Sequence, residues 1–173
     1  QASIRTNRPD TGKAHLEFGP PERVGAIPGS YQPLESVKNL DCLQVTKLML
    51  EMSRASEAYR QHGGIHTSAL SEGETLLVLA EDVGKLNTLD KIMGECLKRG
   101  IEPDGKILLS SGRITSRMLL KAARMRIPIL LSRSSPTSLA VEWADRLGLT
   151  LVGYARGNSC RVYTHEYRIT TGG

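Results

Sequence analysis

Short apolar runs and amphipathic segments alternate in a regular order from residue 75 to residue 164, and this alternation limits the folds open to the chain. Each apolar run is long enough for one buried strand, and each amphipathic segment has one apolar helical face. Such an order predicts an α/β fold in which helices cover the faces of a mainly parallel sheet. The expected strands are 75–80, 106–109, 127–131, 150–154 and 161–164, and the expected helices are 86–99, 115–126 and 137–147.

The part of the chain before these elements divides in two. Apolar residues recur at helical spacing from Val45 to Tyr59, and Gly63-Gly64 follows, which predicts one helix of about five turns. Residues 1–40 are rich in Pro, Gly and charge, with one candidate strand at 14–18. We therefore expect an N-terminal arm, or the remnant of a truncated subdomain, at 1–40 and one α/β domain at 41–173. The start at Gln1 instead of Met leads us to expect that an N-terminal portion is missing.

The charge of the chain favours an anionic ligand. The net charge is +5 and the pI is about 9.3, which suits a nucleotide, a phosphate-bearing cofactor or a nucleic acid. A nucleic acid is the least favoured of the three, because the basic residues are dispersed among acidic ones and aromatic residues make up only 4% of the chain. No run approaches the roughly 20 apolar residues that cross a bilayer, so we expect a cytoplasmic protein with no membrane partner.

The cysteines do not predict a disulfide framework or a zinc site. Cys42, Cys96 and Cys160 are far apart in the sequence and form no Cys-x-x-Cys pair. The signature of the zinc deaminases, a His-x-Glu followed by Pro-Cys-x-x-Cys, is also absent. We therefore expect a reducing compartment and no bound metal.

Polar residues gather in the loops that follow three expected strands, at 81–88, 110–113 and 132–138. Loops at the carboxyl ends of parallel strands meet at one edge of a sheet, and hydroxyls, backbone N–H groups and cations there suit a phosphate or pyrophosphate. The alternative is that these residues only cap helices or form surface ion pairs. The candidate binding residues in these loops and the helix that follows the first are Glu81, Asp82, Gly84, Lys85, Asn87, Asp90, Lys91, Ser110, Ser111, Arg113, Ser132, Arg133, Thr137 and Ser138.

A further group of candidates, Gly63, Gly64 and His66, follows the long helix. A pair of glycines lets a ligand approach the backbone closely, and His66 can act as an acid, a base or a donor to an anion. The alternative is a helix stop followed by a structural histidine.

These motifs together resemble one known family. Gly63-Gly64-x-His66, Glu81-Asp82-Val83-Gly84, Asp90-Lys91, Ser110-Ser111-Gly112-Arg113 and Leu151-Val152-Gly153-Tyr154 are similar, in order and spacing, to the FdhD/NarQ family of formate dehydrogenase accessory sulfurtransferases. The resemblance runs from about Val45 to Ile169. It implies a cytidine-deaminase-like, three-layer α/β/α domain that forms a homodimer and binds the molybdenum cofactor as Mo-bis molybdopterin guanine dinucleotide, which GDP mimics. It also implies a cysteine desulfurase and formate dehydrogenase as partners.

The chain departs from the family where sulfur chemistry is expected. The family's persulfide-carrying Cys-Gly-x-Cys-Gly loop, which precedes the Gly-Gly-x-His motif, is missing, so no catalytic residue is assigned. Smaller departures are Leu86 for the usual His, Lys85 for the usual Arg and His62 for the usual Thr. Two hypotheses remain open. Either the loop is omitted from this sequence and the protein transfers sulfur from the desulfurase to the cofactor, or the protein is a cofactor-binding chaperone without sulfur transfer.

Overall fold

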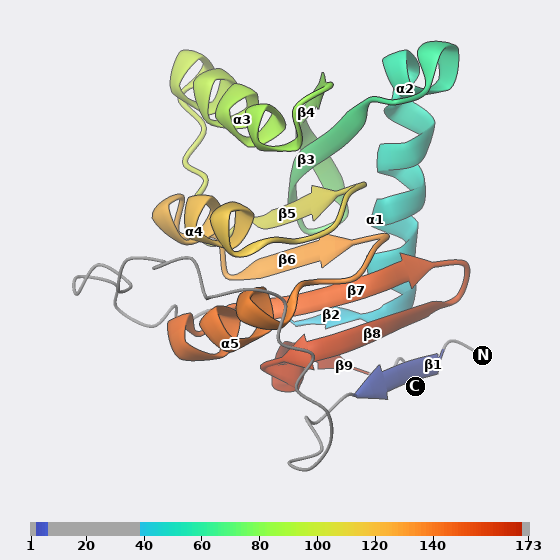
Figure 1. Cartoon of the computed structure of the whole chain (residues 1–173), viewed down its shortest axis with the longest axis vertical. Coiled ribbons are helices and arrows are strands. Elements are labelled where there is room, and N and C mark those ends of the chain that lie inside the picture. The colour runs from blue at the N-terminus through green and yellow to red at the C-terminus, as the bar shows by residue number, and fades with distance from the viewer. Residues whose placement is uncertain (1–2, 7–38, 171–173) are drawn as a thin grey trace, which may run out of the picture.

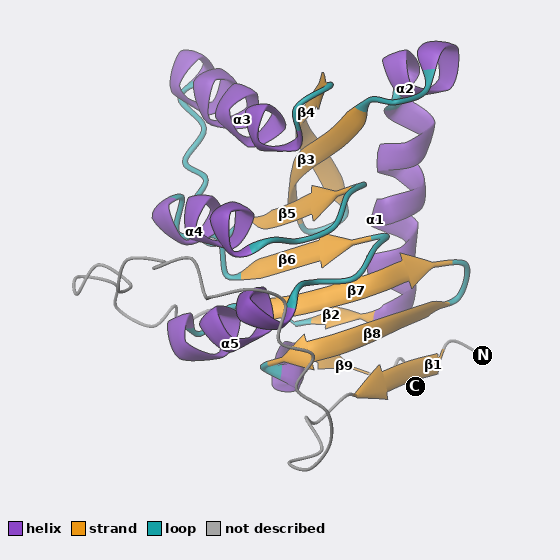
Figure 2. Ribbon diagram, in the orientation of Figure 1, coloured by secondary structure: helices purple, strands orange, loops and turns teal. Residues whose placement is uncertain are grey.

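The computed structural model describes residues 3–6 and 39–170 and shows a three-layer α/β arrangement (Figure 1). Three helices cover one face of a seven-stranded sheet, and a fourth helix crosses the other face (Figure 2). The strands, in their order across the sheet, are β1 (Ser3–Thr6), β8 (Ser159–Thr164), β7 (Thr150–Arg156), β6 (Ile129–Ser132), β5 (Ile107–Ser110), β3 (His66–Glu72) and β4 (Thr75–Asp82). The first face carries α3 (Lys85–Arg99), α4 (Ser116–Arg124) and α5 (Ser138–Leu147), and the other carries α1 (Cys42–Ala55).

Shorter elements complete the described chain. The helix α2 (Glu57–His62) follows α1, and the two-stranded pairing of β2 (Leu40–Asp41) with β9 (Ile169–Thr170) brings together the two ends of the main described range. A 3-10 turn, η1 (Glu166–Arg168), precedes β9.

The predicted α/β class is confirmed, and the sheet is mixed. Three of the six pairings between its described strands are parallel: β5 with β6, β6 with β7, and β1 with β8. The strand β3 accounts for two antiparallel pairings and was not predicted, because Thr67, Ser68 and Ser71 interrupt its apolar pattern. It forms a hairpin with β4 through a turn at Gly73, whose φ of 55° suits glycine. Because β3 is antiparallel to both of its neighbours, β4 and β5 run in the same direction on either side of it.

The predicted five-turn helix is wrong in one respect, since the structure divides it at Ser56. Asp41 caps α1 through a capping box with Gln44, in which each side chain bonds the other residue's backbone N–H. At the other end, the Ser56 hydroxyl donates to the Met52 carbonyl at 2.7 Å, and the backbone leaves the helical region. A serine hydroxyl that bonds back to the preceding turn competes with the helical hydrogen bonds. The chain therefore bends before α2.

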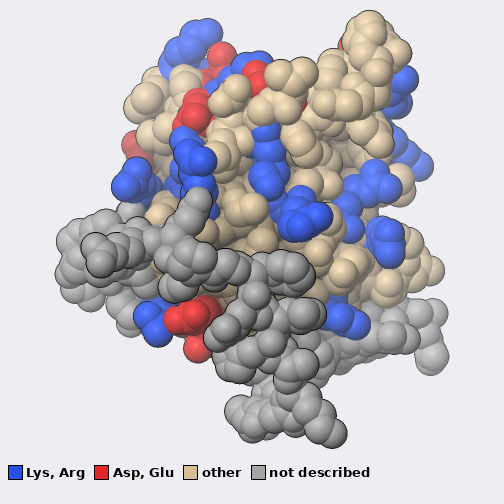
Figure 3. Space-filling model, in the orientation of Figure 1, with Lys and Arg blue, Asp and Glu red and all other residues tan. Residues whose placement is uncertain are grey.

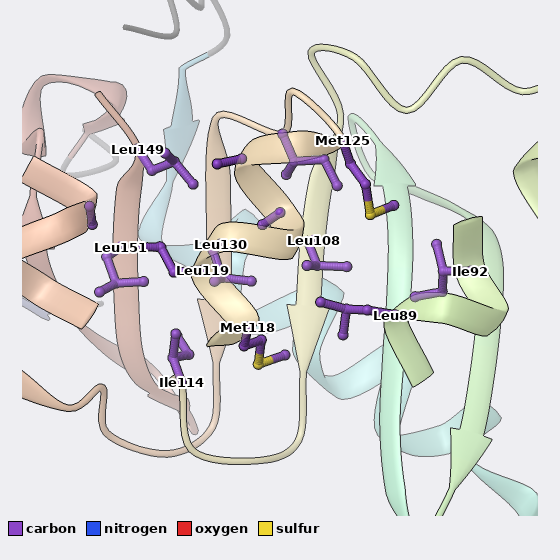
Figure 4. Packing of buried hydrophobic residues seen from close by; sticks show 14 of the residues in the cluster. Leu89, Ile92, Leu108, Ile114, Met118, Leu119, Met125, Leu130, Leu149 and Leu151 are labelled. Atoms are coloured by element: carbon purple, nitrogen blue, oxygen red, sulfur yellow. The ribbon is translucent and has the colours of Figure 1, made fainter. Parts of the chain in front are cut away.

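Apolar residues pack in two layers, one on each face of the sheet. Leu108, Leu130 and Leu151 of the central strands contact α4 and its neighbours on the first face (Figure 4). On the other face, Ile107, Leu109, Ile129, Leu131 and Val152 pack against α1. Because successive strand residues point to opposite faces, a short apolar strand can supply both layers. The central strands are thus fully buried and hold the strand-end loops on a rigid base.

The predicted N-terminal arm contributes one described element. The strand β1 pairs with β8 in parallel, with Thr6 opposite Val162. The candidate strand at 14–18 lies outside the described residues, and the division at residue 40 stays a prediction. Among the helices of the described ranges, none has the length and apolar character needed to cross a membrane.

Candidate functional site

The loops singled out in the sequence lie at one edge of the sheet. The register places His66 opposite Asp82, Ser68 opposite Ser110, and Ser110 opposite Ser132. The carboxyl ends of β4, β5 and β6 therefore share an edge with the start of β3. The arrowheads of β5, β6 and β7 point toward this edge, beside α1 (Figure 1). Basic side chains gather over this part of the surface (Figure 3).

Several candidate hydroxyls hold these loops to one another. Ser132 Oγ donates to the Gly112 carbonyl at 2.7 Å, and Ser111 Oγ accepts from the Thr67 backbone N–H at 2.9 Å. Ser110 Oγ accepts from the Gly112 N–H at 3.2 Å. Backbone bonds add to these contacts, since the Thr137 N–H donates to the Ile114 carbonyl and the Arg133 N–H to the Ser110 carbonyl. The edge is therefore preorganised by its own hydrogen bonds.

A cavity of about 330 Å³ opens at this edge between α1, α2, β3 and two strand-end loops. Four predicted binding residues line it, namely Gly64, His66, Ser111 and Arg133. The lining residues that sequence reasoning did not select are Met52, Ser53, Ser56, Tyr59, Ile65 and Thr67. Most of these come from the bend between α1 and α2, which the uninterrupted helix of the prediction could not reveal. Gly63, the other glycine of the predicted pair, ends α2 with a φ of 63°.

The side chains of His66 and Lys85 both lie close to Gly112. A Cβ atom on Gly112 would lie 3.0 Å from His66 Nδ1 and 3.0 Å from Lys85 Cδ, so glycine permits this approach. Lys85 Nζ donates to the Arg113 carbonyl at 2.7 Å, which joins two of the predicted loops. Burial, and then the positive charge of Arg113, lower the pKa of Lys85 from its ordinary value. A bound anion would relieve part of this repulsion.

Asp82 is the centre of a network within its own loop. Its carboxylate accepts from the Gly84 N–H at 2.8 Å and from Asn87 Nδ2 at 3.0 Å, and it pairs with Lys91 at 2.6 Å. The hydrogen bond from Lys91, followed by those from Gly84 and Asn87, lowers the pKa of Asp82 to about 2. Lys91 also donates to the Glu81 carbonyl at 2.8 Å. These candidate residues fix the loop before α3.

Other candidates take part in contacts between elements. The Glu81 carboxylate accepts from backbone N–H groups at the start of α2. Asp90 pairs with Lys121 of α4, and Thr137 caps α5 by accepting from the Ala140 N–H at 3.3 Å. Ser138 lines a separate cavity of about 640 Å³ beside α5 and β8. The structure thus brings Gly64, His66, Ser111 and Arg133 into one cavity. The residues that it places outside the lining of this cavity are Glu81, Asp90, Thr137 and Ser138.

A larger cavity, of about 680 Å³, lies along α1 and shares Arg133 with the smaller one. Sequence reasoning did not select its other cations, Lys47 on α1 and Arg156 on β7. The polar Arg156-Gly157-Asn158 turn at the end of an apolar strand is the signal that could have identified part of it. The residues that line this cavity are Asp41, Leu43, Gln44, Thr46, Lys47, Met49, Leu50, Ser53, Glu74, Arg133, Arg156, Gly157 and Asn158.

The cysteines lie in the two apolar layers. Cys96 is buried between α3 and the sheet, whereas Cys42 and Cys160 are buried in the layer under α1. Within the described ranges, no three His, Cys, Asp or Glu side chains are grouped so that they could hold a metal ion.

Comparison with known proteins gives consistent matches. A family model described as the FdhD/NarQ family matches residues 25–170. The chain is 43% identical over 137 residues to sulfur carrier protein FdhD of Geobacillus kaustophilus, which covers 79% of this chain and 51% of that protein. It is 43% identical over 122 residues to sulfur carrier protein FdhD of Bacillus subtilis, covering 70% of this chain and 47% of that protein. The chain therefore spans about half the length of these relatives.

A solved structure agrees with the sequence matches. A crystal structure of a Desulfotalea psychrophila protein assigned as a formate dehydrogenase accessory protein superposes with a TM-score of 0.74 at 35% identity. The superposition covers 81% of this chain and 60% of that one. Since the family model, the relatives and this structure each cover most of the described residues, the chain belongs to the FdhD/NarQ family.

Proposed function

We propose that this protein is an accessory protein of formate dehydrogenase that binds the guanine dinucleotide form of the molybdenum cofactor as its cargo. The observation that carries the proposal is the cavity at the sheet edge, where His66 and Arg133 line a space of about 330 Å³ beside the preorganised loops. A cavity of this size suits part of a nucleotide-bearing ligand. Phosphate groups favour arginine, which can donate two parallel hydrogen bonds.

The two neighbouring cavities support a ligand with several phosphates. Arg133 lines both, and its Nη1 lies 3.3 Å from Ser53 Oγ, on the wall between them. Lys47 and Arg156 extend the positive charge along the larger cavity. A phosphate at Arg133 can therefore belong to a ligand that continues into either space.

The sulfur-transfer part of the proposal rests on the relatives, which are named sulfur carrier proteins. In this proposal the protein works as a cytoplasmic homodimer, receives sulfur from a cysteine desulfurase, and passes it to the cofactor before insertion into formate dehydrogenase. In such a transfer a cysteine thiolate accepts the sulfur and carries it as a persulfide.

One observation favours the second candidate, a cofactor chaperone without sulfur transfer. All three cysteines of the chain are buried, with exposed fractions of 1% for Cys42, 1% for Cys96 and 3% for Cys160. Burial raises the pKa of the Cys96 thiol and that of the Cys160 thiol. A buried neutral thiol is a poor acceptor for a persulfide from another protein.

Binding is tested with GDP. We expect GDP to raise the melting temperature of the wild-type chain, because a ligand that binds only the folded state stabilises it. Arg133→Ala should weaken GDP binding by about 10- to 100-fold in calorimetry, the range for losing a hydrogen bond to a charged group. The control is Arg126→Ala. Arg126 lies between α4 and β6, at the opposite end of the strands, and its side chain pairs with Asp104. If both variants bind GDP as tightly as the wild type, the GDP site does not include Arg133.

Sulfur transfer is tested separately with a cysteine desulfurase and radiolabelled cysteine. A protein-bound label that dithiothreitol releases supports the sulfur-carrier proposal. GDP binding without such a label supports the chaperone, and absence of both contradicts the proposed function.

A further inference from the structure

The structure brings two distant cysteines into contact. Cys42 is the first residue of α1 and Cys160 lies in β8, 118 positions later, yet their Sγ atoms are 2.9 Å apart, close enough for either thiol to donate a hydrogen bond to the other. A disulfide has a sulfur-to-sulfur distance of about 2.05 Å, so bond formation needs a movement of less than an ångström. Neither the spacing of the cysteines nor a sequence motif indicates this contact.

Of the three cysteines, only Cys42 and Cys160 are placed so that they can form a disulfide with each other. Cys96 belongs to the layer between α3 and the sheet, while Cys42 and Cys160 belong to the layer under α1. The sheet therefore separates Cys96 from the other two thiols, and Cys96 serves as an internal control.

Residues close to both cysteines in the chain line the larger cavity. Both chain neighbours of Cys42, Asp41 and Leu43, line that cavity, and so does Asn158, two residues before Cys160. A bond between the thiols would join the start of α1 to the strand that follows the Arg156-Gly157-Asn158 turn. It would thereby fix one wall of the cavity relative to the other.

We infer that Cys42 and Cys160 are a redox modification site, at which a peroxide converts the two thiols into a reversible disulfide that ties α1 to β8. One thiol first reduces the peroxide and becomes a sulfenic acid, releasing one molecule of water or alcohol. The second thiol attacks that sulfur and expels water as the disulfide forms. The two cysteines together lose two electrons and two protons, and a dithiol reductant returns them. This site is independent of the proposed function, because its formation needs no cofactor.

Burial sets the rate of the reaction. Removal from water, and then the contact with Cys42, raise the pKa of Cys160, so the reactive thiolate is scarce in the closed structure. The start of α1 has to open before a peroxide reaches the pair, and openings at helix ends need less energy than global unfolding. We therefore expect slow oxidation of the native protein that is limited by local opening.

The test maps the disulfide in the wild-type chain. The protein is incubated with hydrogen peroxide, denatured with an alkylating reagent and digested for mass spectrometry. We expect one linked peptide pair containing Cys42 and Cys160, with Cys96 alkylated, and full alkylation of all three after dithiothreitol. Alkylation of both Cys42 and Cys160 after oxidation, irreversible oxidation without a link, or a disulfide to Cys96 would each overturn the inference.

A second measurement compares the melting temperatures of the oxidised and the reduced wild-type protein. Closing a long loop should raise the melting temperature of the oxidised protein by about 5–15 °C, and dithiothreitol should reverse the rise. Cys96→Ser should keep both the link and the shift, whereas Cys42→Ser should lose both. A linked protein that melts at the temperature of the reduced form would contradict a tie between α1 and β8.

Discussion

The Glu81 carboxylate accepts a hydrogen bond from the backbone N–H of Tyr59 at 3.0 Å, which connects the end of β4 to the first turn of α2. The other carboxylate oxygen accepts from the Ala58 N–H at the same distance. Ser56, which precedes α2, makes no side-chain cap of its own. A residue from a distant strand thus supplies the cap, and through it the strand-end loop positions Tyr59 in the wall of the smaller cavity.

Removal of this carboxylate should loosen α2. We expect Glu81→Ala to lower the free energy of unfolding by about 1–2 kcal/mol, as for the loss of a helix cap that bonds two N–H groups. Hydrogen exchange at Ala58 and Tyr59 should become faster. The matched control is Glu95→Ala, which removes an exposed pair with Lys98 and should change stability by no more than about 0.5 kcal/mol. Equal effects of the two substitutions would show that Glu81 does not cap α2.

Asp82 should make stability depend on acidity. Its pKa is lowered from 3.8 to about 2 in the folded protein, so its contribution is fully present above pH 4 and is lost as the pH falls toward 2. We therefore expect the difference in unfolding free energy between wild type and Asp82→Asn to shrink over that interval. Chemical denaturation at several pH values measures it. A difference that stays constant from pH 5 to about pH 2 would show that the network does not hold the carboxylate in its charged form.

Gly153 and Gly94 should respond to alanine in opposite directions. A Cβ on Gly153 would lie 2.9 Å from the Ser134 carbonyl oxygen, which belongs to the backbone and cannot easily move, so we expect a loss of about 1–3 kcal/mol. A Cβ on Gly94, inside α3, would meet no atom within 4 Å beyond its chain neighbours and the backbone of the helix itself. Gly94→Ala should therefore gain about 0.5–1 kcal/mol through helix propensity. Urea denaturation measures both, and a tolerated Gly153→Ala would refute the close contact between β7 and the loop after β6.

Gly112 offers a test of the close approach of His66 and Lys85 to this glycine. Gly112→Ala should displace both side chains, because its Cβ would lie 3.0 Å from each. We expect GDP affinity to fall about tenfold, or roughly 1.4 kcal/mol, with a shift of the His66 ring resonances in NMR spectra. Gly94→Ala is the control and should leave both signals unchanged. Unaltered His66 resonances in Gly112→Ala would disprove the close approach of His66 to Gly112, whatever happens to GDP binding.

Much of the α/β framework follows from local pattern. Continuous apolar runs predicted β5, β6 and β7, and apolar residues at helical spacing predicted α3, α4 and α5. Parallel strands in a sheet end at the same edge, so the convergence of the polar loops was predictable as well. Local patterns suffice for these elements because each one shows the apolar face that it buries.

Other features depend on partners that are distant in the sequence. The strand β3 is buried although it carries Thr67 and Ser68, because Ser68 Oγ bonds Thr88 Oγ1 of α3 at 2.7 Å and Thr67 Oγ1 donates to the Glu81 carboxylate at 3.3 Å. Burying a polar group without such a partner costs free energy, and no window of local sequence contains these partners. The bend at Ser56 likewise accompanies the cap from Glu81.

The sequence by itself therefore determined the class of fold, the position of the central strands and the edge at which polar loops meet. The tertiary structure decided which of those loop residues line a cavity, which hold the loops together, and that Cys42 lies against Cys160. The physical reason is that periodicity records only which face of an element is buried. Hydrogen bonds and contacts between elements depend on how those faces are finally packed against one another.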